Sequence, residues 1–162
     1  MKYRSNVPKY SEFLFEVVDP KFYERAKGIR DSGKHNIIIA GLSYGQGSSR
    51  EHAALCPMFM GVKAVIAKSF ERIHTANLIN FGIIPLTFKN EKDYEKISQG
   101  DQLEIPDIRT IIEKGEPLMV HNKTNGASFE VEYALSDRQK KILLAGGTLS
   151  YMKEQSAMKK VV

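Results

Sequence analysis

Cysteine is almost absent from this chain, and that absence limits what it can build. Cys56 is the one cysteine among 162 residues, and tryptophan is missing altogether. A single thiol excludes an internal disulfide, and it excludes an iron–sulfur cluster or a structural zinc site ligated by cysteines of this chain alone. Low cysteine usage fits a reducing compartment, so a cytoplasmic protein is expected.

Long apolar runs and blocks of like charge are also lacking. No apolar stretch approaches the roughly 20 residues of a membrane span, and the opening MKYRSNVPKY has no apolar core of a signal peptide. The net charge of +5 is modest and its basic residues are scattered. The pattern is typical of a solvated surface, and with no aromatic-plus-basic stacking surface it does not favour a nucleic-acid partner. We therefore expect no membrane contact.

The length and composition are sufficient for one domain with its own core. The chain is 42% hydrophobic and 27% charged, which is ordinary for a globular protein. A chain of 162 residues buries most of its unfolded surface without a disulfide or a metal. We predict one domain over residues 1–155 and a frayed tail over residues 156–162.

The middle of the chain alternates between short aliphatic runs and helical stretches. Residues 37–40 and 64–67 carry no polar alternation, as in strands covered on both faces. A helix is expected after each run, the second one between a Ser69 cap and Gly82. A third strand then contains Pro85, which suggests an edge or a bulge. This order predicts parallel strands joined by right-handed crossovers.

The C-terminal third has a different pattern. Residues 118–121 and 129–133 flank the pair Asn125-Gly126, which is favoured in two-residue type I′ hairpin turns. Ser136 and Gln139 have the spacing of a capping box at the start of the last helix. The predicted fold class is therefore α/β, with a parallel βαβαβ core and an added antiparallel layer.

The stretch GLSYGQGSSREHAAL (residues 41–55) joins the first strand to the first helix. In open α/β sheets, ligands bind beyond the carboxyl ends of such strands. Gly45 and Gly47 allow main-chain amides to approach a ligand closely. Ser48 and Glu51 fit the spacing of a capping box, which would direct the free N–H groups of a first helical turn outward.

Arg50 adds a planar fork suited to a carboxylate or a phosphate. Spacing alone leaves two interpretations open, a tight turn with a helix cap or a site for an anion. A nucleotide site is not favoured, because Arg50 occupies the third glycine position of the dinucleotide fingerprint and the second strand ends in Lys68-Ser69 without an acidic residue. No Gly-Lys-Ser/Thr follows the loop either.

Two strings carry a resemblance to a known family. YGQGSSREHAAL, followed by AVIAKSFERIHTANLINFGIIPLTF, resembles the C-terminal swivelling domain of aconitases. The match runs from residue 37 to residue 88 in the same order, and it extends more loosely from YRSNVPKYSEFLF to the last helix. Aconitases, homoaconitases and isopropylmalate isomerases share this domain, either fused or as a separate small subunit. The resemblance implies a swivelling β/β/α domain.

The resemblance also implies a reaction and roles for particular residues. The reaction would convert citrate to isocitrate through cis-aconitate. Ser48 would be the base that removes a proton from the carbon beside a carboxylate. Ser49 and Arg50 would bind substrate, with Arg50 gripping the carboxylate and helping to hold Ser48 reactive. Arg4 would be a second carboxylate-binding arginine. The family's [4Fe–4S] cluster would be ligated outside this chain, which would bind no metal itself.

The expected partners follow from the same resemblance. They are a tricarboxylate (citrate, cis-aconitate or isocitrate) and the cluster-bearing aconitase domains, in cis or as a large subunit. The strand that usually precedes the RSN segment is absent, so we expect a domain excised from a longer chain and inactive alone. The alternatives are a small subunit of isopropylmalate isomerase, a homoaconitase or, from another class, an RNA-binding regulatory module. His52, His74 and Cys56 are interpreted as packing residues.

Overall fold

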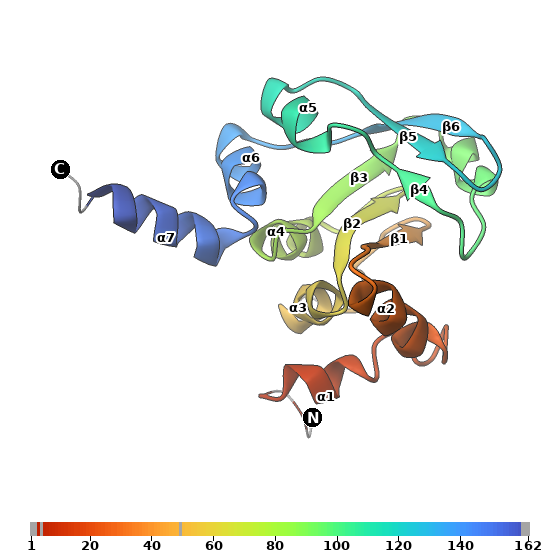
Figure 1. Ribbon diagram of the computed structural model, residues 1–162, viewed down its shortest axis with the longest axis horizontal. Helices are drawn as coiled ribbons and strands as arrows, with labels where there is room; N and C mark the ends of the chain where they lie inside the picture. The colour runs from red at the N-terminus through yellow and green to blue at the C-terminus, as the bar shows by residue number, and fades with distance from the viewer. Residues whose placement is uncertain (1–2, 4, 49, 160–162) are drawn as a thin grey trace.

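The computed structural model describes residue 3, residues 5–48 and residues 50–159, the last without its side chain. The strands are β1 (Asn36–Ala40), β2 (Val62–Ala67), β3 (Ile84–Phe88), β4 (Leu103–Glu104), β5 (Leu118–Asn122) and β6 (Ser128–Glu132). The helices are α1 (Val7–Ser11), α2 (Phe22–Asp31), α3 (His52–Phe59), α4 (Arg72–Asn80), the 3-10 helix η1 (Glu91–Lys96), α5 (Ile108–Lys114), α6 (Asp137–Leu144) and α7 (Thr148–Lys159). The strands form one mixed sheet in the order β1-β2-β3-β6-β5-β4 (Figure 1).

Strands β1, β2 and β3 are parallel, which confirms the predicted core. Helices α3 and α4 are the crossover helices that connect them in turn. A dry apolar cluster joins these helices to β2, and it consists of Ala54, Val62, Val65, Leu78 and Ile83. Burial of such side chains contributes about 25 cal/mol per Å² of apolar surface and fixes the two helices against the sheet.

The prediction of an edge strand or a bulge at Pro85 is wrong. Strand β3 lies inside the sheet, between β2 and β6, and Pro85 is in regular register with Val65. Pairing with β6 begins only at Thr87. The missing N–H group of the proline therefore costs no ladder bond on that side, and an interior strand can accept it.

Strands β4, β5 and β6 form the antiparallel layer that the sequence predicted. The hairpin between β5 and β6 is confirmed, but its turn is longer than a two-residue type I′ turn. Gly126 has a positive φ of 78° whereas Asn125 does not, and type I′ geometry needs both. The Asn122 side chain instead organises the connection, because its Oδ1 accepts from the N–H groups of Thr124 and Asn125.

The C-terminal end of the described chain is helical. The capping box of Ser136 and Gln139 is confirmed at the start of α6. Helix α7 continues to Lys159, and the domain over residues 1–155 with a frayed tail over residues 156–162 stays a prediction. This stretch contains neither glycine nor proline, so nothing in it stops the helix. The helix projects from the body of the molecule (Figure 1).

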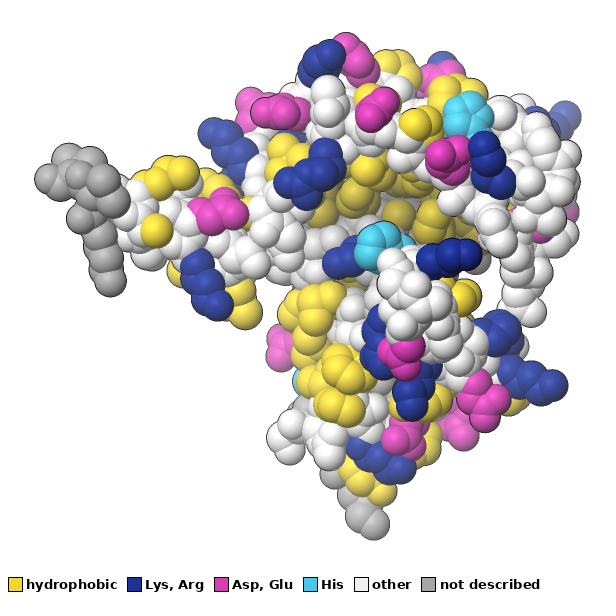
Figure 2. Space-filling model, in the orientation of Figure 1, with side chains coloured by type: hydrophobic (Ala, Val, Ile, Leu, Met, Phe, Trp, Pro, Cys, Tyr) yellow, Lys and Arg dark blue, Asp and Glu magenta, His cyan; other side chains and the backbone are white. Residues whose placement is uncertain are grey.

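The surface agrees with the scattered charge of the sequence. Figure 2 shows lysine and arginine side chains spread over the visible face, without one continuous basic block, and apolar side chains along the projecting α7. Within the described ranges, no helix has the length and apolar character needed to cross a membrane.

Candidate functional site

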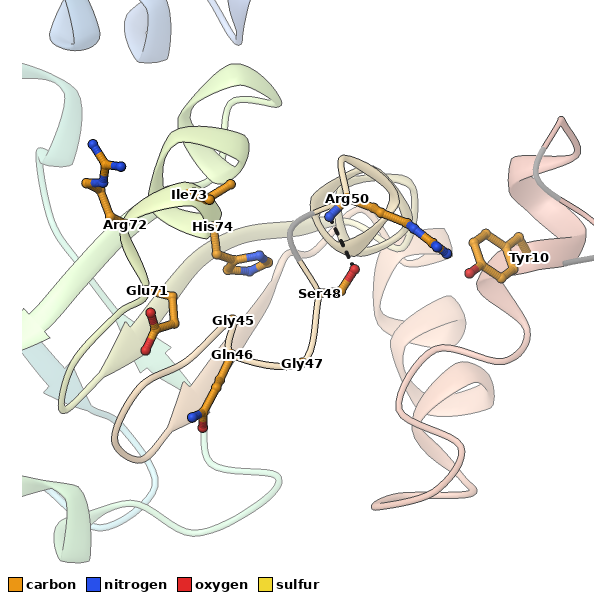
Figure 3. A pocket seen from close by; sticks show the side chains of 10 residues that line it. All are labelled: Tyr10, Gly45, Gln46, Gly47, Ser48, Arg50, Glu71, Arg72, Ile73 and His74. Carbon is orange, nitrogen blue, oxygen red and sulfur yellow. Dashed lines mark hydrogen bonds between the residues drawn. The ribbon is translucent and has the colours of Figure 1, made fainter.

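An open hollow of about 830 Å³ lies where the chain leaves the carboxyl ends of β1 and β2. One wall is the glycine loop, defined here as residues 43–48, and the other is the first turn of α4. Helix α1 closes a third side (Figure 3). The residues that line the hollow are Tyr10, Gly45, Gln46, Gly47, Ser48, Arg50, Glu71, Arg72, Ile73 and His74.

The base of the glycine loop is held firmly. The N–H of Tyr44 donates to the carbonyl of Ser69 at 2.9 Å, and the N–H of Glu71 donates to the carbonyl of Tyr44 at 2.9 Å. The Ser69 hydroxyl accepts from the N–H of Ser43 at 2.7 Å. Ser69 therefore connects two loops by hydrogen bonds. The predicted cap of α4 by Ser69 is wrong, because α4 begins at Arg72 with Glu71 as its N-cap residue.

The tip of the glycine loop is held weakly. The N–H of Gln46 reaches the carbonyl of Ser43 at 3.2 Å, and the N–H of Ser48 reaches that of Gly45 at 3.4 Å. In the part of the chain that the structure describes, the N–H groups of Gly45 and Gly47 donate no hydrogen bond. Free amide donors of this kind can bind an anion.

Gly45 is required by its surroundings. Its φ is +101°, and a Cβ atom at this position would overlap the Cβ of His74. The loop backbone and helix α4 therefore approach as closely as the absence of a side chain allows. By contrast, a Cβ atom at Gly47 would meet nothing within 4 Å, so the loop tip borders open space.

Ser48 lies in the hollow, but not as the predicted cap. Helix α3 begins at His52, and its N-cap residue Glu51 makes no side-chain capping bond, so the capping box of Ser48 and Glu51 is wrong. The Ser48 hydroxyl accepts from the N–H of Arg50 at 3.2 Å (Figure 3). This local turn competes with the helical conformation and delays the start of α3. The Ser48 hydroxyl still lines the hollow.

Arg50 lines the same hollow, so the structure brings two of the predicted site residues together. Arg50 is exposed, and in Figure 3 its side chain extends toward Tyr10 of α1. His52 packs edge-on against Tyr10, with ring centroids 5.5 Å apart, as expected for a packing residue. Arg4 and Ser49, the other predicted substrate-binding residues, lie outside the described residues, and their roles stay predictions.

Tyr10 and His74 are two of the lining residues that sequence reasoning missed. Tyr10 lies 33 to 38 positions before the residues of the loop, and only the packing of α1 against α3 brings it there. In α4, Ile73 is 54% exposed, whereas the adjacent His74 is 2% exposed. The helix begins later than predicted, at Arg72, and its buried residues are His74, Leu78 and Ile79.

The electrostatics of the hollow follow from burial. Burial lowers the pKa of His74, so its imidazole is neutral near pH 7, and burial raises the pKa of Tyr44 to about 12. The two rings are in edge contact, with centroids 5.0 Å apart. Within the hollow, Glu71 is the acidic lining residue, whereas Arg72 extends away from the loop in Figure 3. Arg50 is therefore the lining cation nearest Ser48 in sequence and in that view.

The described residues do not fit a resident metal centre. No group of three or more histidine, cysteine, aspartate or glutamate side chains gathers anywhere in that part of the chain. Cys56 is buried, and burial raises the pKa of its thiol, so it packs as a small apolar residue. The expectation that an iron–sulfur cluster is ligated elsewhere in a complete enzyme stays a prediction.

Free glycine amides, a serine hydroxyl and an arginine lie together ahead of a helix N-terminus at one edge of this α/β domain. The family model of the aconitase C-terminal domain matches residues 4–91, just over half of the chain. The chain therefore belongs to the aconitase C-terminal domain family, and the resemblance carried by the two strings is confirmed.

Individual relatives agree with this assignment. The chain is 39% identical over 137 residues to a probable mitochondrial aconitate hydratase of Dictyostelium discoideum, covering 83% of this chain and 18% of the relative. It is 42% identical over 130 residues to the mitochondrial homocitrate dehydratase of Saccharomyces cerevisiae, covering 76% of this chain and 16% of the relative. The chain thus spans less than a fifth of the curated relatives it matches.

A solved structure confirms the fold class. The crystal structure of 3-isopropylmalate dehydratase from Methanocaldococcus jannaschii superposes with a TM-score of 0.76 at 30% identity, covering 96% of this chain and 81% of that one. The α/β swivel fold, with its parallel core and antiparallel layer, is therefore shared.

The expected cytoplasmic location is contradicted by these comparisons. The two relatives named above, and a probable aconitate hydratase of Caenorhabditis elegans that is 41% identical over 138 residues, are mitochondrial proteins. The expectation rested on a single cysteine, and a low cysteine count reports only the absence of a disulfide framework. It does not distinguish one reducing compartment from another.

Proposed function

We propose that this chain is the substrate-binding and proton-abstracting domain of an aconitase-type hydro-lyase that converts citrate to isocitrate through cis-aconitate. The observation that carries the proposal is the meeting of the Ser48 hydroxyl, Arg50 and the free glycine amides in one open hollow. Family membership supports the same chemistry, since the relatives named above are hydratases and dehydratases.

Ser48 acts as the base in this proposal. A serine hydroxyl is a poor base in water, so its deprotonated form needs nearby donors and a cation. The N–H of Arg50 already donates to the Ser48 Oγ at 3.2 Å, and the Arg50 guanidinium carries positive charge into the same hollow. Ser48 then takes the proton from the carbon beside a carboxylate. That carbon–hydrogen bond breaks, and a double bond forms as hydroxide leaves the adjacent carbon.

Arg50 and the glycine loop hold the substrate. A guanidinium binds a carboxylate through two parallel hydrogen bonds, which fixes both distance and orientation. The N–H groups of Gly45 and Gly47 are donors for a second oxygen atom. Arg4 and Ser49 would complete the set, as the family resemblance implies. The leaving hydroxyl would need activation by residues beyond the described part of this chain.

The missing part of the site is proposed to come from the rest of an aconitase-type enzyme. The relatives are more than five times longer than the matched region, which supports partner domains in cis or on a large subunit. Alone, the chain would show no turnover. The names of the relatives support a mitochondrial location.

One observation favours a second candidate, the small subunit of an isopropylmalate isomerase. The structural match to 3-isopropylmalate dehydratase covers most of both chains, which suits a subunit of this length. A homoaconitase is supported in the same way by the 42% identity with homocitrate dehydratase. Turnover of citrate, homocitrate and isopropylmalate by the complete enzyme separates the three.

The test of the proposal is Ser48→Ala in the complete enzyme. Loss of a general base lowers turnover by about 100- to 10,000-fold, while citrate binding persists because Arg50 remains. Ser136→Ala is the matched control, since it also removes a serine hydroxyl that accepts a backbone N–H at a helix start, but in α6. Steady-state rates and citrate titration measure both variants. Full turnover by Ser48→Ala would end the base assignment.

A further inference from the structure

His74 is a buried polar side chain that the proposed reaction does not use. It is 2% exposed, and both ring nitrogens lack a hydrogen-bond partner within the described residues. Buried polar atoms are nearly always paired, so an unpaired imidazole calls for an explanation. Figure 3 shows its ring beside Gly45, directed toward the side of the hollow that carries Ser48.

The groups that could pair with this ring belong to the glycine loop. A neutral imidazole offers one donor and one acceptor nitrogen, and the N–H groups of Gly45 and Gly47 are unused donors. Gly45 is already in van der Waals contact with the Cβ of His74. Unused donors and an unused acceptor therefore lie on adjoining elements, and a small shift of the loop tip would join them.

The loop is divided in a way that permits this shift. Its base is held by three hydrogen bonds of 2.7 to 2.9 Å, between residues 43–44 and residues 69–71. Its tip is held by two longer contacts of 3.2 and 3.4 Å and borders open space at Gly47. Ser48 lies at the end of the tip. Any movement that pairs His74 with the tip therefore also sets the position of Ser48.

We propose that His74 is a positioning residue for Ser48: when a carboxylate occupies the hollow, a glycine N–H of the loop tip donates to a His74 ring nitrogen and fixes the serine for proton abstraction. The inference rests on the proposed function of Ser48. An apolar side chain of similar size at position 74 would fill the space but would leave the tip unheld, so His74 matters through its hydrogen bond and not through its volume.

The first experiment compares His74→Phe with His74→Gln in the complete enzyme. His74→Phe removes the acceptor and is expected to lower kcat about 10- to 100-fold with little change in KM, because misplacing a reacting group slows chemistry more than binding. His74→Gln, whose side chain can still accept a hydrogen bond, is expected to recover a large part of kcat. His121→Phe is the matched control, a histidine on β5 away from the hollow.

The outcomes separate this inference from the proposed function. If Ser48→Ala is inactive and folded His74→Phe keeps full kcat, the positioning role is overturned and the base assignment stands. If Ser48→Ala keeps full turnover, the proposed function fails first. If His74→Phe does not fold, the ring-nitrogen titration described next decides: a shift of a His74 ring nitrogen on citrate binding supports the role, and unchanged ring nitrogens oppose it.

The second experiment needs no variant and reads the ring directly. The chain is labelled with ¹⁵N-histidine and titrated with citrate, either alone or within the complete enzyme. The expected result is a shift of one His74 ring nitrogen together with the amide signals of Gly45 and Gly47. Citrate binding that moves the loop amides but leaves both ring nitrogens of His74 unchanged would overturn the inference.

Discussion

The parallel and the antiparallel halves of the sheet contribute to different parts of the molecule. The parallel half, β1 to β3 with α3 and α4, supplies the lining of the hollow together with α1. The antiparallel half, β4 to β6, supplies none of the lining residues named above. It provides much of the largest apolar cluster instead, through the buried side chains of Leu118, Val120, Phe129 and Val131.

The difference has a simple physical origin. Parallel strands joined by crossover helices bring their carboxyl ends and the following helix N-termini to one edge, where free N–H groups can face a ligand. In the antiparallel half, strand ends alternate in direction, and each strand alternates buried and exposed side chains. The residues of the candidate site are therefore concentrated in one half, and the other half contributes many of the buried side chains of the core.

Leu118→Ala is expected to have the largest effect on stability and none on the site. Leu118 is fully buried in β5, so the cavity lowers the free energy of unfolding by about 2–5 kcal/mol. Urea denaturation measures the loss, and Met119→Ala, at the neighbouring exposed position, is the control. If the folded Leu118→Ala protein bound citrate more weakly than wild type, the division between the halves would be broken.

Gly45→Ala is expected to disturb both stability and binding. The new Cβ overlaps the His74 Cβ at a positive φ, so the free energy of unfolding falls by about 1–3 kcal/mol and citrate affinity drops. Gly33→Ala, also at positive φ but with open space around it, measures the backbone strain alone. Adding His74→Ala should not rescue Gly45→Ala, since alanine keeps the Cβ atom; a full rescue would contradict the described contact.

Arg50→Lys tests whether the parallel half binds through a fork or merely through charge. Lysine keeps the charge but loses the two parallel hydrogen bonds, so kcat/KM of the complete enzyme should fall about 10- to 100-fold. Arg72→Lys is the matched control, because that arginine borders the same hollow but extends away from the loop (Figure 3). Unchanged kcat/KM in the Arg50→Lys variant would mean that positive charge alone, and not the guanidinium fork, holds the substrate.

The smallest effect is expected where the two halves meet. Lys89, just after β3, forms an ion pair with Glu130 of β6 at 2.7 Å, and this hydrogen bond raises the pKa of Lys89. Because the pKa of Lys89 is raised in the folded state, the ion pair stabilises the fold fully below pH 10.5, the ordinary pKa of lysine. This stabilisation is lost as the pH rises through the pKa that Lys89 has in the folded protein. Lys89→Met should therefore differ slightly from wild type in urea midpoint at pH 7 and low salt, and less at high salt. A difference in urea midpoint that stays the same at high salt would mean that side-chain packing, and not the ion pair, causes it.

Features that depend on short-range spacing were predicted well. The parallel strands, the glycine loop, the hairpin and the Ser136 cap each lie within a few residues of their own signal. The placement of Ser48 and Arg50 at one hollow also followed from the loop. Local competition explains one failure: the Ser48 hydroxyl had a backbone N–H two residues on as an alternative partner, so α3 begins later than predicted.

The amino-acid sequence by itself determined the order of the central strands and helices, the position of the glycine loop and the family, because these depend on residues that are neighbours along the chain. Only the tertiary structure decided that Pro85 is tolerated inside the sheet, that Tyr10 borders the hollow and that His74 is buried against Gly45. Each of these depends on contacts between segments far apart in sequence, whose free energy is set by packing and by the pairing of buried polar groups.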